Sequence, residues 1–372
     1  MLPLQGIKVI EMGQNLAGPY AGFIMAMMGA DVIKVERPGS GDDARAWGPP
    51  FVNDDGALFQ AVNVNKKSIT IDFKDDGDRE KLFQLIEAAD VVVQNLRPGV
   101  MEELGFNADI LRNLNPALIY CAMGAYGHKG PMKHEPGYEP IVQAFGGLMM
   151  VSGEEGAPPI RLGTQALDQG SAMWAVMGIL AALTARATSG EGCVVDTSLF
   201  ETAMGWITIA HSTFNASGKP PARHPTGSAR VVPFEAFETS DGPLIIAAAN
   251  DRLFERLSTA LGQPNWADDD RFKTNADRQE NREVLKALME AELGQHDRAF
   301  WGAALSTAKV PSAPVLTIPE VSVHEQTQAM GMIQQVPGLN FQTMSIPLSF
   351  NGERPQIESA APALGEHNDE VS

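Results

Sequence analysis

The sequence has few basic residues, few cysteines and no long apolar run. Its 372 residues include 28 Lys and Arg against 46 Asp and Glu, which gives a formal net charge of −18. A chain this acidic is not expected to bind nucleic acid, and an anionic ligand would need a local basic pocket. Only two cysteines are present, Cys121 and Cys193, and each lies in an apolar run. We expect both to be small core residues in a reducing, cytoplasmic compartment.

Signals for secretion and for membrane insertion are also missing. The N-terminus lacks a basic stretch followed by an apolar core. The most apolar helical pattern, at about 173–187, is shorter than the roughly 20 residues that span a bilayer, and it contains Arg186. We therefore expect neither a secreted protein nor a membrane protein.

Two common nucleotide-binding motifs are incomplete. The stretch 13–18 is similar to a phosphate-binding loop, but Pro19 and Tyr20 stand where that loop requires Lys and Ser or Thr. No GxGxxG fingerprint follows the first predicted strand. These departures argue against a nucleoside-triphosphate loop and against a dinucleotide fingerprint.

The residues that are present predict an α/β fold. Helical patterns such as 79–89 separate short runs of β-branched residues, at 7–10, 32–35, 69–71, 91–93 and 118–121. This alternation is typical of a parallel, Rossmann-like sheet wrapped by helices. Polar side chains follow several of the strands, at the sheet edge where such folds bind ligands: Gln14, Asn15, Arg37, Asn95 and Arg97.

The chain is long enough for two domains. A stretch rich in Gly, Pro, Ser and His at 216–230 is typical of a linker. Beyond it, a strand pattern at 244–247 precedes three helical patterns that begin near Asp251, Arg278 and Asp297. We predict a large α/β domain over 1–215, a linker over 216–230, a smaller α+β domain over 231–318, and a C-terminal segment over 319–372.

Asp168 is the first candidate for chemistry, since it comes just before the long apolar helical pattern. Helix N-termini carry N–H groups without partners and a positive dipole end, which favour an ionised, oriented carboxylate. Such a carboxylate is either a simple helix cap or a nucleophile. The pattern alone leaves both interpretations open.

An ordered series of motifs covers nearly the whole chain, and together they resemble the class III coenzyme A transferases. That family includes carnitine CoA-transferase, formyl-CoA transferase and alpha-methylacyl-CoA racemase. Besides the Asp168 block, the matching stretches are LQGIKVIE at 4–11, AGP at 17–19, GADVIKVERPG at 29–39, NKKS at 65–68, NLRPGV at 95–100, NPALIY at 115–120, GHKGP at 127–131, PFEAF at 233–237, TSDG at 239–242 and VPSAPV at 310–315.

The resemblance implies a site and an assembly. It makes Asp168 the catalytic nucleophile, with Glu139 beside it, and implies that the C-terminal segment rejoins the large domain in an interlocked, ring-like homodimer. It implies a CoA thioester as substrate, with no metal and no tightly bound cofactor. Contacts to CoA are implied for Asn15, Leu16, Ala17, Arg37, Ile71, Asn95, Leu96, Val100 and Lys129.

The implied reaction moves CoA from an acyl-CoA donor to a carboxylic acid acceptor through an aspartyl-CoA intermediate. Oxyanions formed on the way need N–H donors, and we expect them among the amides of Gln169, Gly170 and the 146–147 turn.

Two other functions stay open. An alpha-methylacyl-CoA racemase needs a His in a Gly-His-Asp motif, which reads Gly137-Tyr138-Glu139 here, and a Glu where this chain has Asn250. His134 is a possible substitute for that His. The other open function is acyl-CoA binding without catalysis.

Overall fold

The computed structural model describes residues 2–228 and 230–371, which form two compact units. The first unit comprises Met1–Leu148, Arg161–His211 and His324–Ser372. The second comprises Met149–Ile160 and Ser212–Val323. The limits predicted at residues 215, 230 and 318 stay predictions.

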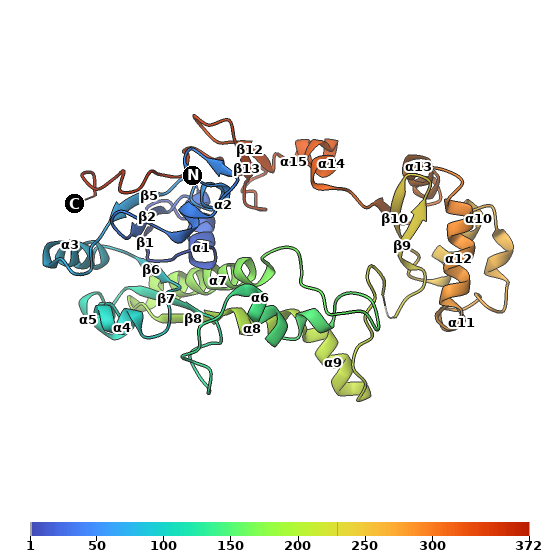
Figure 1. The fold of residues 1–372 in the computed structure, drawn as a ribbon, viewed down its shortest axis with the longest axis horizontal. Coiled ribbons are helices and arrows are strands. Elements are labelled where there is room, and N and C mark those ends of the chain that lie inside the picture. Colours follow the sequence, from blue (N-terminus) through green and yellow to red (C-terminus); the bar gives the residue numbers. More distant parts are fainter. Residues whose placement is uncertain (1, 229, 372) are drawn as a thin grey trace. The chain divides into compact units, whose positions relative to one another are not determined.

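The first unit is built on a six-stranded parallel sheet (Figure 1), which confirms the predicted α/β class. The strand order is β5-β2-β1-β6-β7-β8. All five predicted strands are present, and β8 is an addition at the edge. Their bounds are β1 Lys8–Glu11, β2 Asp31–Glu36, β5 Lys67–Thr70, β6 Val91–Gln94, β7 Ile119–Gly124 and β8 Val194–Ser198.

Two hydrophobic clusters cover the two faces of this sheet. Val9 and Val91 belong to one cluster, and their chain neighbours Ile10 and Val92 belong to the other. Successive strand residues point to opposite faces, so the central strands β1 and β6 are buried on both sides. The first cluster includes α1 (Ala17–Met27) and α7 (Ala166–Ser189), and the second includes α3 (Asp76–Glu87), α4 (Val100–Leu104) and α5 (Ala108–Leu114).

Helix α7 is longer than the sequence pattern indicates. It begins at Ala166, so Asp168 lies inside the first turn and not ahead of the helix. With 24 residues, α7 is also long and apolar enough to cross a membrane by length and composition alone, which corrects the expectation that it is too short. Part of it is buried, since Ala172, Ala175 and Ile179 belong to the same core cluster as α1.

The two cysteines differ in environment. Cys121 lies in β7 and is fully buried, as expected, whereas Cys193 is exposed just before β8. The prediction of a core position for Cys193 is therefore wrong, because β8 is an edge strand whose first residues are largely accessible.

The C-terminal segment runs along the open edge of the same sheet, beside β5. The Asn65 amide donates to Gln356 O (3.0 Å), and Thr70 N donates to Asn368 Oδ1 (2.8 Å). His367 N donates to Ser68 O at 2.9 Å. These bonds cover a strand edge that would otherwise present unpaired backbone groups.

The second unit has an antiparallel sheet of three strands in the order β11-β10-β9, with helices packed on it. Its core contains Phe237, Leu244, Phe254, Leu285 and Trp301. The predicted strand and the three predicted helical regions are present. Bounds are β9 Phe234–Thr239, β10 Gly242–Ala247, β11 Ser312–Pro314, α10 Asp251–Ala260, α11 Asn275–Glu280, α12 Arg282–Leu293, α13 Arg298–Thr307 and α14 Ile318–Val323.

The remaining α-helices and strands within the described residues have the following bounds. They are β3 Phe51–Val52, β4 Asp55–Gly56, α2 Ala57–Val62, α6 Glu139–Phe145, α8 Leu199–Trp206, α9 Thr208–Ser217, α15 Glu325–Met330, β12 Ile333–Gln335 and β13 Gln342–Met344.

The tight connection from α7 to β8 gives a test of this packing. A Cβ atom at Gly192 would lie 2.0 Å from Leu118 O, which is backbone and cannot swing away. We expect Gly192→Ala to lower the free energy of unfolding by about 1–3 kcal/mol. In the control Gly205→Ala, nothing lies within 4 Å of the new Cβ, and helix propensity predicts a gain of about 0.5–1 kcal/mol. Urea denaturation measures both, and equal stability of the two variants would contradict the described packing.

Candidate active site

Asp168 lies at the start of α7, and a carboxylate from another helix caps that start. Glu139 is the first residue of α6, and its Oε1 and Oε2 accept hydrogen bonds from Leu167 N and Asp168 N, each at 3.1 Å. The N-cap residue Gln165 makes no side-chain capping bond. Glu139 therefore satisfies two of the free amides of α7, and the interpretation of Asp168 as the helix cap is wrong.

Glu139 is itself held by a buried amide. Gln143 Nε2 donates to Glu139 Oε1 at 2.8 Å, and Gln143 Oε1 accepts from Leu162 N at 2.9 Å. Gln143 is fully buried and Glu139 is 5% exposed. Sequence reasoning missed Gln143, although its spacing of four residues from Glu139 places both on one helix face.

The position of Glu139 sets the charge of Asp168. Burial, and then the charge and hydrogen bond of Glu139, raise the pKa of Asp168 from its ordinary 3.8 to about 7. We expected the helix start to keep Asp168 ionised, and this is corrected, because the first amides of α7 bond to Glu139 instead. Near neutral pH the two carboxyl groups thus share a site in which Asp168 readily takes up or releases a proton.

Helix α8 packs tightly against the first turns of α7. A Cβ atom at Gly170 would lie 2.8 Å from Thr202 Cγ2 and 2.9 Å from Trp206 Cζ2. The Trp206 indole also donates to Ala166 O at 3.4 Å. A larger residue at position 170 would force the Thr202 or Trp206 side chain to shift, so this close packing supports the turn that carries Asp168.

The predicted oxyanion donors are mostly engaged elsewhere. Gly146 N donates to Val142 O at 2.7 Å, and Gln169 N donates to Gln165 O at 3.0 Å. Gly147 N makes a longer bond to Ala144 O, at 3.4 Å. Gly170 lies within α7. The expectation that the amides of Gly146 and Gln169 are free for an oxyanion is therefore wrong, because helix hydrogen bonding uses them.

The residues implied for CoA contact mostly lie at one edge of the sheet. Parallel strands end at the same edge, and the strand order reverses between β1 and β6, where α/β sheets bind ligands. Asn15, Leu16 and Ala17 follow β1, Arg37 follows β2, Ile71 follows β5, Asn95 and Leu96 follow β6, and Val100 begins α4. Lys129 lies in an exposed loop after β7.

Several of these side chains are already bonded. Asn95 accepts from Gln14 N (2.8 Å) and donates to Gln14 O (3.0 Å), which ties the ends of β6 and β1 together. Arg37 donates to Gly41 O (3.2 and 3.3 Å) and pairs with Asp43, while about half of its side chain stays exposed. Leu16, Ala17 and Ile71 are buried, so their side chains serve the core.

No group of three or more His, Cys, Asp and Glu residues within 2–228 and 230–371 is arranged to hold a metal ion.

Known proteins match this chain along its whole length. The profile described as CoA-transferase family III matches residues 4–368. A protein from Acetobacter aceti named acetyl-CoA:oxalate CoA-transferase is 37% identical over 365 residues, covering 98% of this chain and 93% of its own. Succinate–glutarate CoA-transferase from Agrobacterium fabrum is 35% identical, covering 99% and 94%. The crystal structure of a CAIB/BAIF family protein from Brucella suis has a TM-score of 0.91 at 37% identity and full coverage of both chains.

The raised pKa of Asp168 predicts a pH-dependent stability difference. A carboxyl whose folded pKa lies above its unfolded value destabilises the fold increasingly as pH rises from about 4 to about 7. The neutral variant Asp168→Asn escapes this cost. We expect it to be more stable than the wild type by about 2 kcal/mol at pH 8. This is about half of the free energy that corresponds to the whole pKa difference, because the side chain is only half-buried and solvent screens its charge. Urea denaturation at pH 4.5 and 8 tests this, and a difference that shrinks with rising pH would contradict it.

Proposed function

The chain belongs to CoA-transferase family III, and from this premise we propose that Asp168 carries CoA between two carboxylic acids as an aspartyl-CoA thioester. One observation supports this most strongly. The Asp168 carboxyl is half-buried, its backbone is fixed by Glu139, and its pKa is raised to about 7, first by burial and then by Glu139. A carboxylate with a pKa near the working pH is a better nucleophile than an ordinary aspartate and is still partly ionised.

The covalent steps follow from carboxylate chemistry. A carboxylate oxygen of Asp168 attacks the thioester carbonyl of the donor, the carbon–sulfur bond breaks, and CoA leaves as a thiolate. The thiolate then attacks the aspartyl carbonyl of the resulting mixed anhydride, and the donor acid departs as a carboxylate. The acceptor carboxylate reverses both steps, leaves as its own CoA thioester and restores Asp168. One nucleophile thus divides a hard exchange into easier steps.

Glu139 has two effects in this scheme. Its carboxylate oxygens hold the amides of Leu167 and Asp168, so the reacting residue keeps one backbone position through the cycle. Its negative charge also makes the ionised form of Asp168 less stable, which raises the basicity of the nucleophile. We therefore propose that the catalytic role predicted for Glu139 is to position Asp168 and to raise its pKa.

The names of the relatives indicate a class of acids. One is named for acetyl-CoA and oxalate and the other for succinate and glutarate, so each name includes a dicarboxylic acid, while acetyl-CoA carries a monocarboxylic acyl group. We extend this to the present chain and propose a small dicarboxylic acid as its acceptor. CoA itself would lie at the sheet edge formed by Asn15, Leu16, Ala17, Arg37, Ile71, Asn95, Leu96 and Val100, with Lys129 as a further contact.

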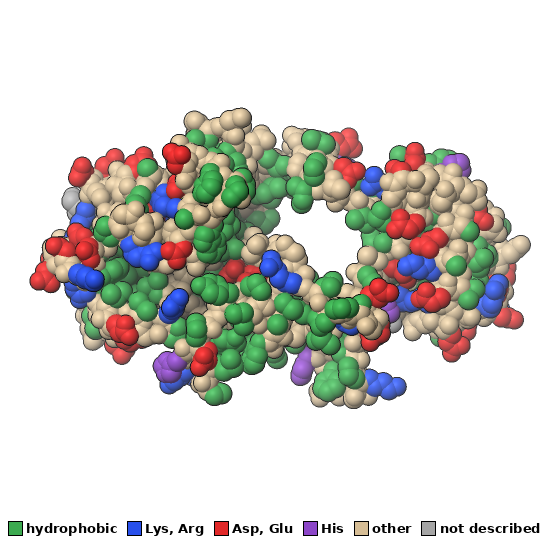
Figure 2. Space-filling model, viewed as in Figure 1, with side chains coloured by type: hydrophobic (Ala, Val, Ile, Leu, Met, Phe, Trp, Pro, Cys, Tyr) green, Lys and Arg blue, Asp and Glu red, His purple; other side chains and the backbone are tan. Residues whose placement is uncertain are grey.

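A homodimer is part of the proposal. Met173, Trp174 and Met177 of α7, together with Met204 and Trp206 of α8, are large apolar residues that are 42–47% exposed. Figure 2 shows hydrophobic side chains gathered over this part of the first unit. A second chain that covers this surface fits the interlocked dimer implied by the resemblance. A cytoplasmic location is also proposed, supported by two cysteines that are both free thiols.

The structure gives a reason to prefer CoA transfer over racemisation. The racemase pattern places a Glu where this chain has Asn250, whose Oδ1 accepts from Leu253 N at 3.0 Å and caps α10. The chain has Gly137-Tyr138-Glu139 where a racemase has its catalytic Gly-His-Asp motif. Glu139 of this motif caps the start of α7. The relatives reported above are also named as transferases. A protein that only binds acyl-CoA would not need an aspartate whose pKa is raised to about 7.

Covalent labelling tests the proposed intermediate. The protein is mixed with succinyl-CoA or acetyl-CoA, trapped with hydroxylamine or borohydride, and mapped by mass spectrometry. We expect a modified Asp168 peptide in the wild type and none in Asp168→Ala. An unmodified wild type that exchanges the α proton of a 2-methylacyl-CoA with deuterium would overturn the proposal in favour of a racemase.

The pH dependence of turnover tests the role of Glu139. Because Asp168 reacts when ionised, kcat should rise with pH through about 7. Glu139→Gln removes the charge and keeps one acceptor oxygen, so the midpoint should move down by about one pH unit. The control is Glu201→Gln, an exposed α8 carboxylate that bonds Ser198 and is expected to leave the midpoint unchanged. A midpoint that stays at about 7 in Glu139→Gln would exclude tuning by this residue.

A further inference from the structure

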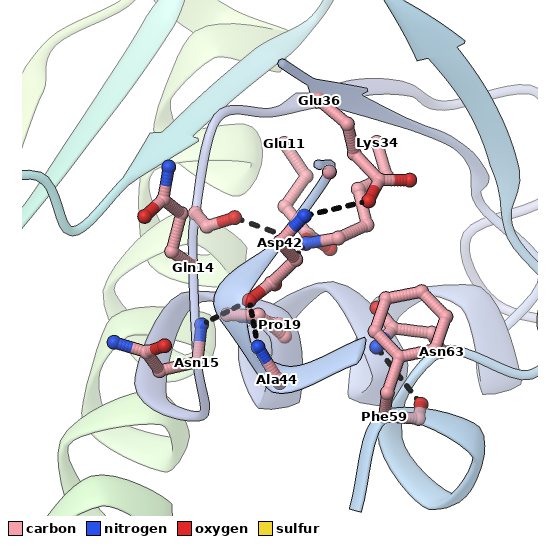
Figure 3. Close-up of polar contacts among 12 residues, drawn as sticks. Glu11, Gln14, Asn15, Pro19, Lys34, Glu36, Asp42, Ala44, Phe59 and Asn63 are labelled. Carbon is pink, nitrogen blue, oxygen red and sulfur yellow. Dashed lines mark hydrogen bonds and ion pairs between the residues drawn. The ribbon is translucent and has the colours of Figure 1, made fainter. Parts of the chain in front are cut away.

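The segment from Gly13 to Pro19, called the Gly13–Pro19 loop below, consists of the connection between β1 and α1 and the first three residues of α1, and it carries three of the residues proposed to contact CoA. Side chains from four other segments bond its backbone, and Figure 3 shows two of them, Lys34 and Asp42. These bonds are Lys34 Nζ to Gly13 O (3.0 Å), Asn95 to both backbone groups of Gln14 (2.8 and 3.0 Å), Asn15 N to Asp42 Oδ1 (2.9 Å) and Lys66 Nζ to Pro19 O (2.7 Å).

The two lysines and Asp42 belong to one buried charged cluster. Glu11 joins the lysines, since its Oε1 lies 2.9 Å from Lys34 Nζ and its Oε2 lies 2.6 Å from Lys66 Nζ. Lys34 also pairs with Asp42 at 2.8 Å. All four side chains are at most 3% exposed.

Two further members hold Asp42 from the other side. Glu36 Oε2 accepts from Asp42 N at 2.9 Å, and the Arg45 guanidinium bonds both oxygens of Glu36, at 2.7 and 2.8 Å. The Arg45 guanidinium also pairs with Asp55 at 2.9 Å, so the cluster contains four carboxylates, Glu11, Glu36, Asp42 and Asp55, and three cations, Lys34, Lys66 and Arg45. This pairing makes the burial of so many charges tolerable, and loss of one partner would leave an uncompensated charge.

Asp42 bonds the loop at Asn15, whose backbone conformation is unfavourable. Asn15 has φ of 66°, in the left-handed region that residues other than glycine rarely adopt. Asp42 Oδ1 accepts the Asn15 amide and also the Ala44 amide, which joins the two loops that follow β1 and β2. Burial tends to raise the pKa of Asp42, but the neighbouring Lys34 ammonium lowers it overall, so the carboxylate stays ionised.

Asp42 is too deeply buried and has the wrong charge to bind an anionic nucleotide itself. Its side chain is about 1% exposed, and phosphate groups would be repelled by a carboxylate. Its effect on a ligand must therefore pass through the loop, by its bond to Asn15 N and by its ion pair with Lys34, which bonds Gly13 O.

We propose that Asp42 is a positioning residue for CoA binding, which holds the Gly13–Pro19 loop in its binding conformation before the ligand arrives. This inference rests on the proposed function. A loop that is ordered in advance binds without the entropic cost of ordering, so loss of Asp42 should weaken CoA binding and leave the chemistry on Asp168 unchanged.

Calorimetric titration of free CoA into the full-length protein tests this. We expect Asp42→Ala to raise the Kd for CoA by about tenfold or more and to raise KM for the acyl-CoA, while kcat at saturation stays within about twofold. Asp42→Asn keeps an acceptor oxygen for Asn15 N, so its effect on Kd should be smaller. It also serves as the test variant if the alanine variant does not fold.

A matched control separates positioning from general stability. Ser68 is fully buried in the same cluster and donates to Glu36 Oε1 at 2.6 Å, but its side chain does not bond the Gly13–Pro19 loop. Ser68→Ala should lower the melting temperature and leave the Kd for CoA unchanged. A folded Asp42→Ala, or Asp42→Asn where only that variant folds, with wild-type affinity would overturn the inference. So would equal losses of affinity in the Ser68 and Asp42 variants. A wild type that does not bind CoA at all would instead overturn the proposed function.

Discussion

The Glu139 carboxylate bonds the amides of Leu167 and Asp168, and both the position and the charge of Asp168 depend on this contact. Helix N-termini attract anions, and here the anion comes from a neighbouring helix. Glu139 therefore gains the stabilisation that Asp168 would otherwise have. Asp168 is left half-buried beside a negative charge, with its pKa raised to about 7 by burial and by Glu139.

Packing around this contact keeps it in place. Val142 of α6, Leu167 of α7 and Ala203 of α8 share one small hydrophobic cluster, which joins the helix of Glu139 to that of Asp168. Gly170 allows Trp206 and Thr202 to approach the same turn closely. A carboxylate pair whose charges repel is thus held together by apolar contacts and by the buried Gln143. Such a site stores a destabilising interaction that the rest of the fold compensates.

The sequence predicts the regular parts of this protein and identifies Asp168, while the detail of the site depends on contacts between distant residues. The runs of β-branched residues are local signals, so the five strands and the helices of the second unit follow from them. Edge strand β8 is not among the predicted strands, although the apolar run around Cys193 leads into it, because the polar residues Asp196, Thr197 and Ser198 shorten that run. The helix start at Ala166 is missed because its cap, Glu139, lies 29 residues before Asp168 in the chain.

Hydrogen bonds and ion pairs between residues far apart in the sequence also explain the other differences between the predictions and the structure. Nothing near position 168 indicates that Glu139 will take the amides of α7, so a local argument gives Asp168 the ordinary charge of a helix-capping residue. Glu11, Lys34, Asp42 and Lys66 come from different segments of the chain, and only the fold brings them together around the Gly13–Pro19 loop.

A direct titration of Asp168 tests the central claim that Glu139 and burial together make this carboxyl a group that ionises near neutral pH. The side-chain carboxyl can be followed by carbon-13 NMR of protein labelled at aspartate, with Asp168→Asn identifying the signal. We predict a midpoint near 7 in the wild type. A midpoint near the ordinary aspartate value of about 4 would contradict it.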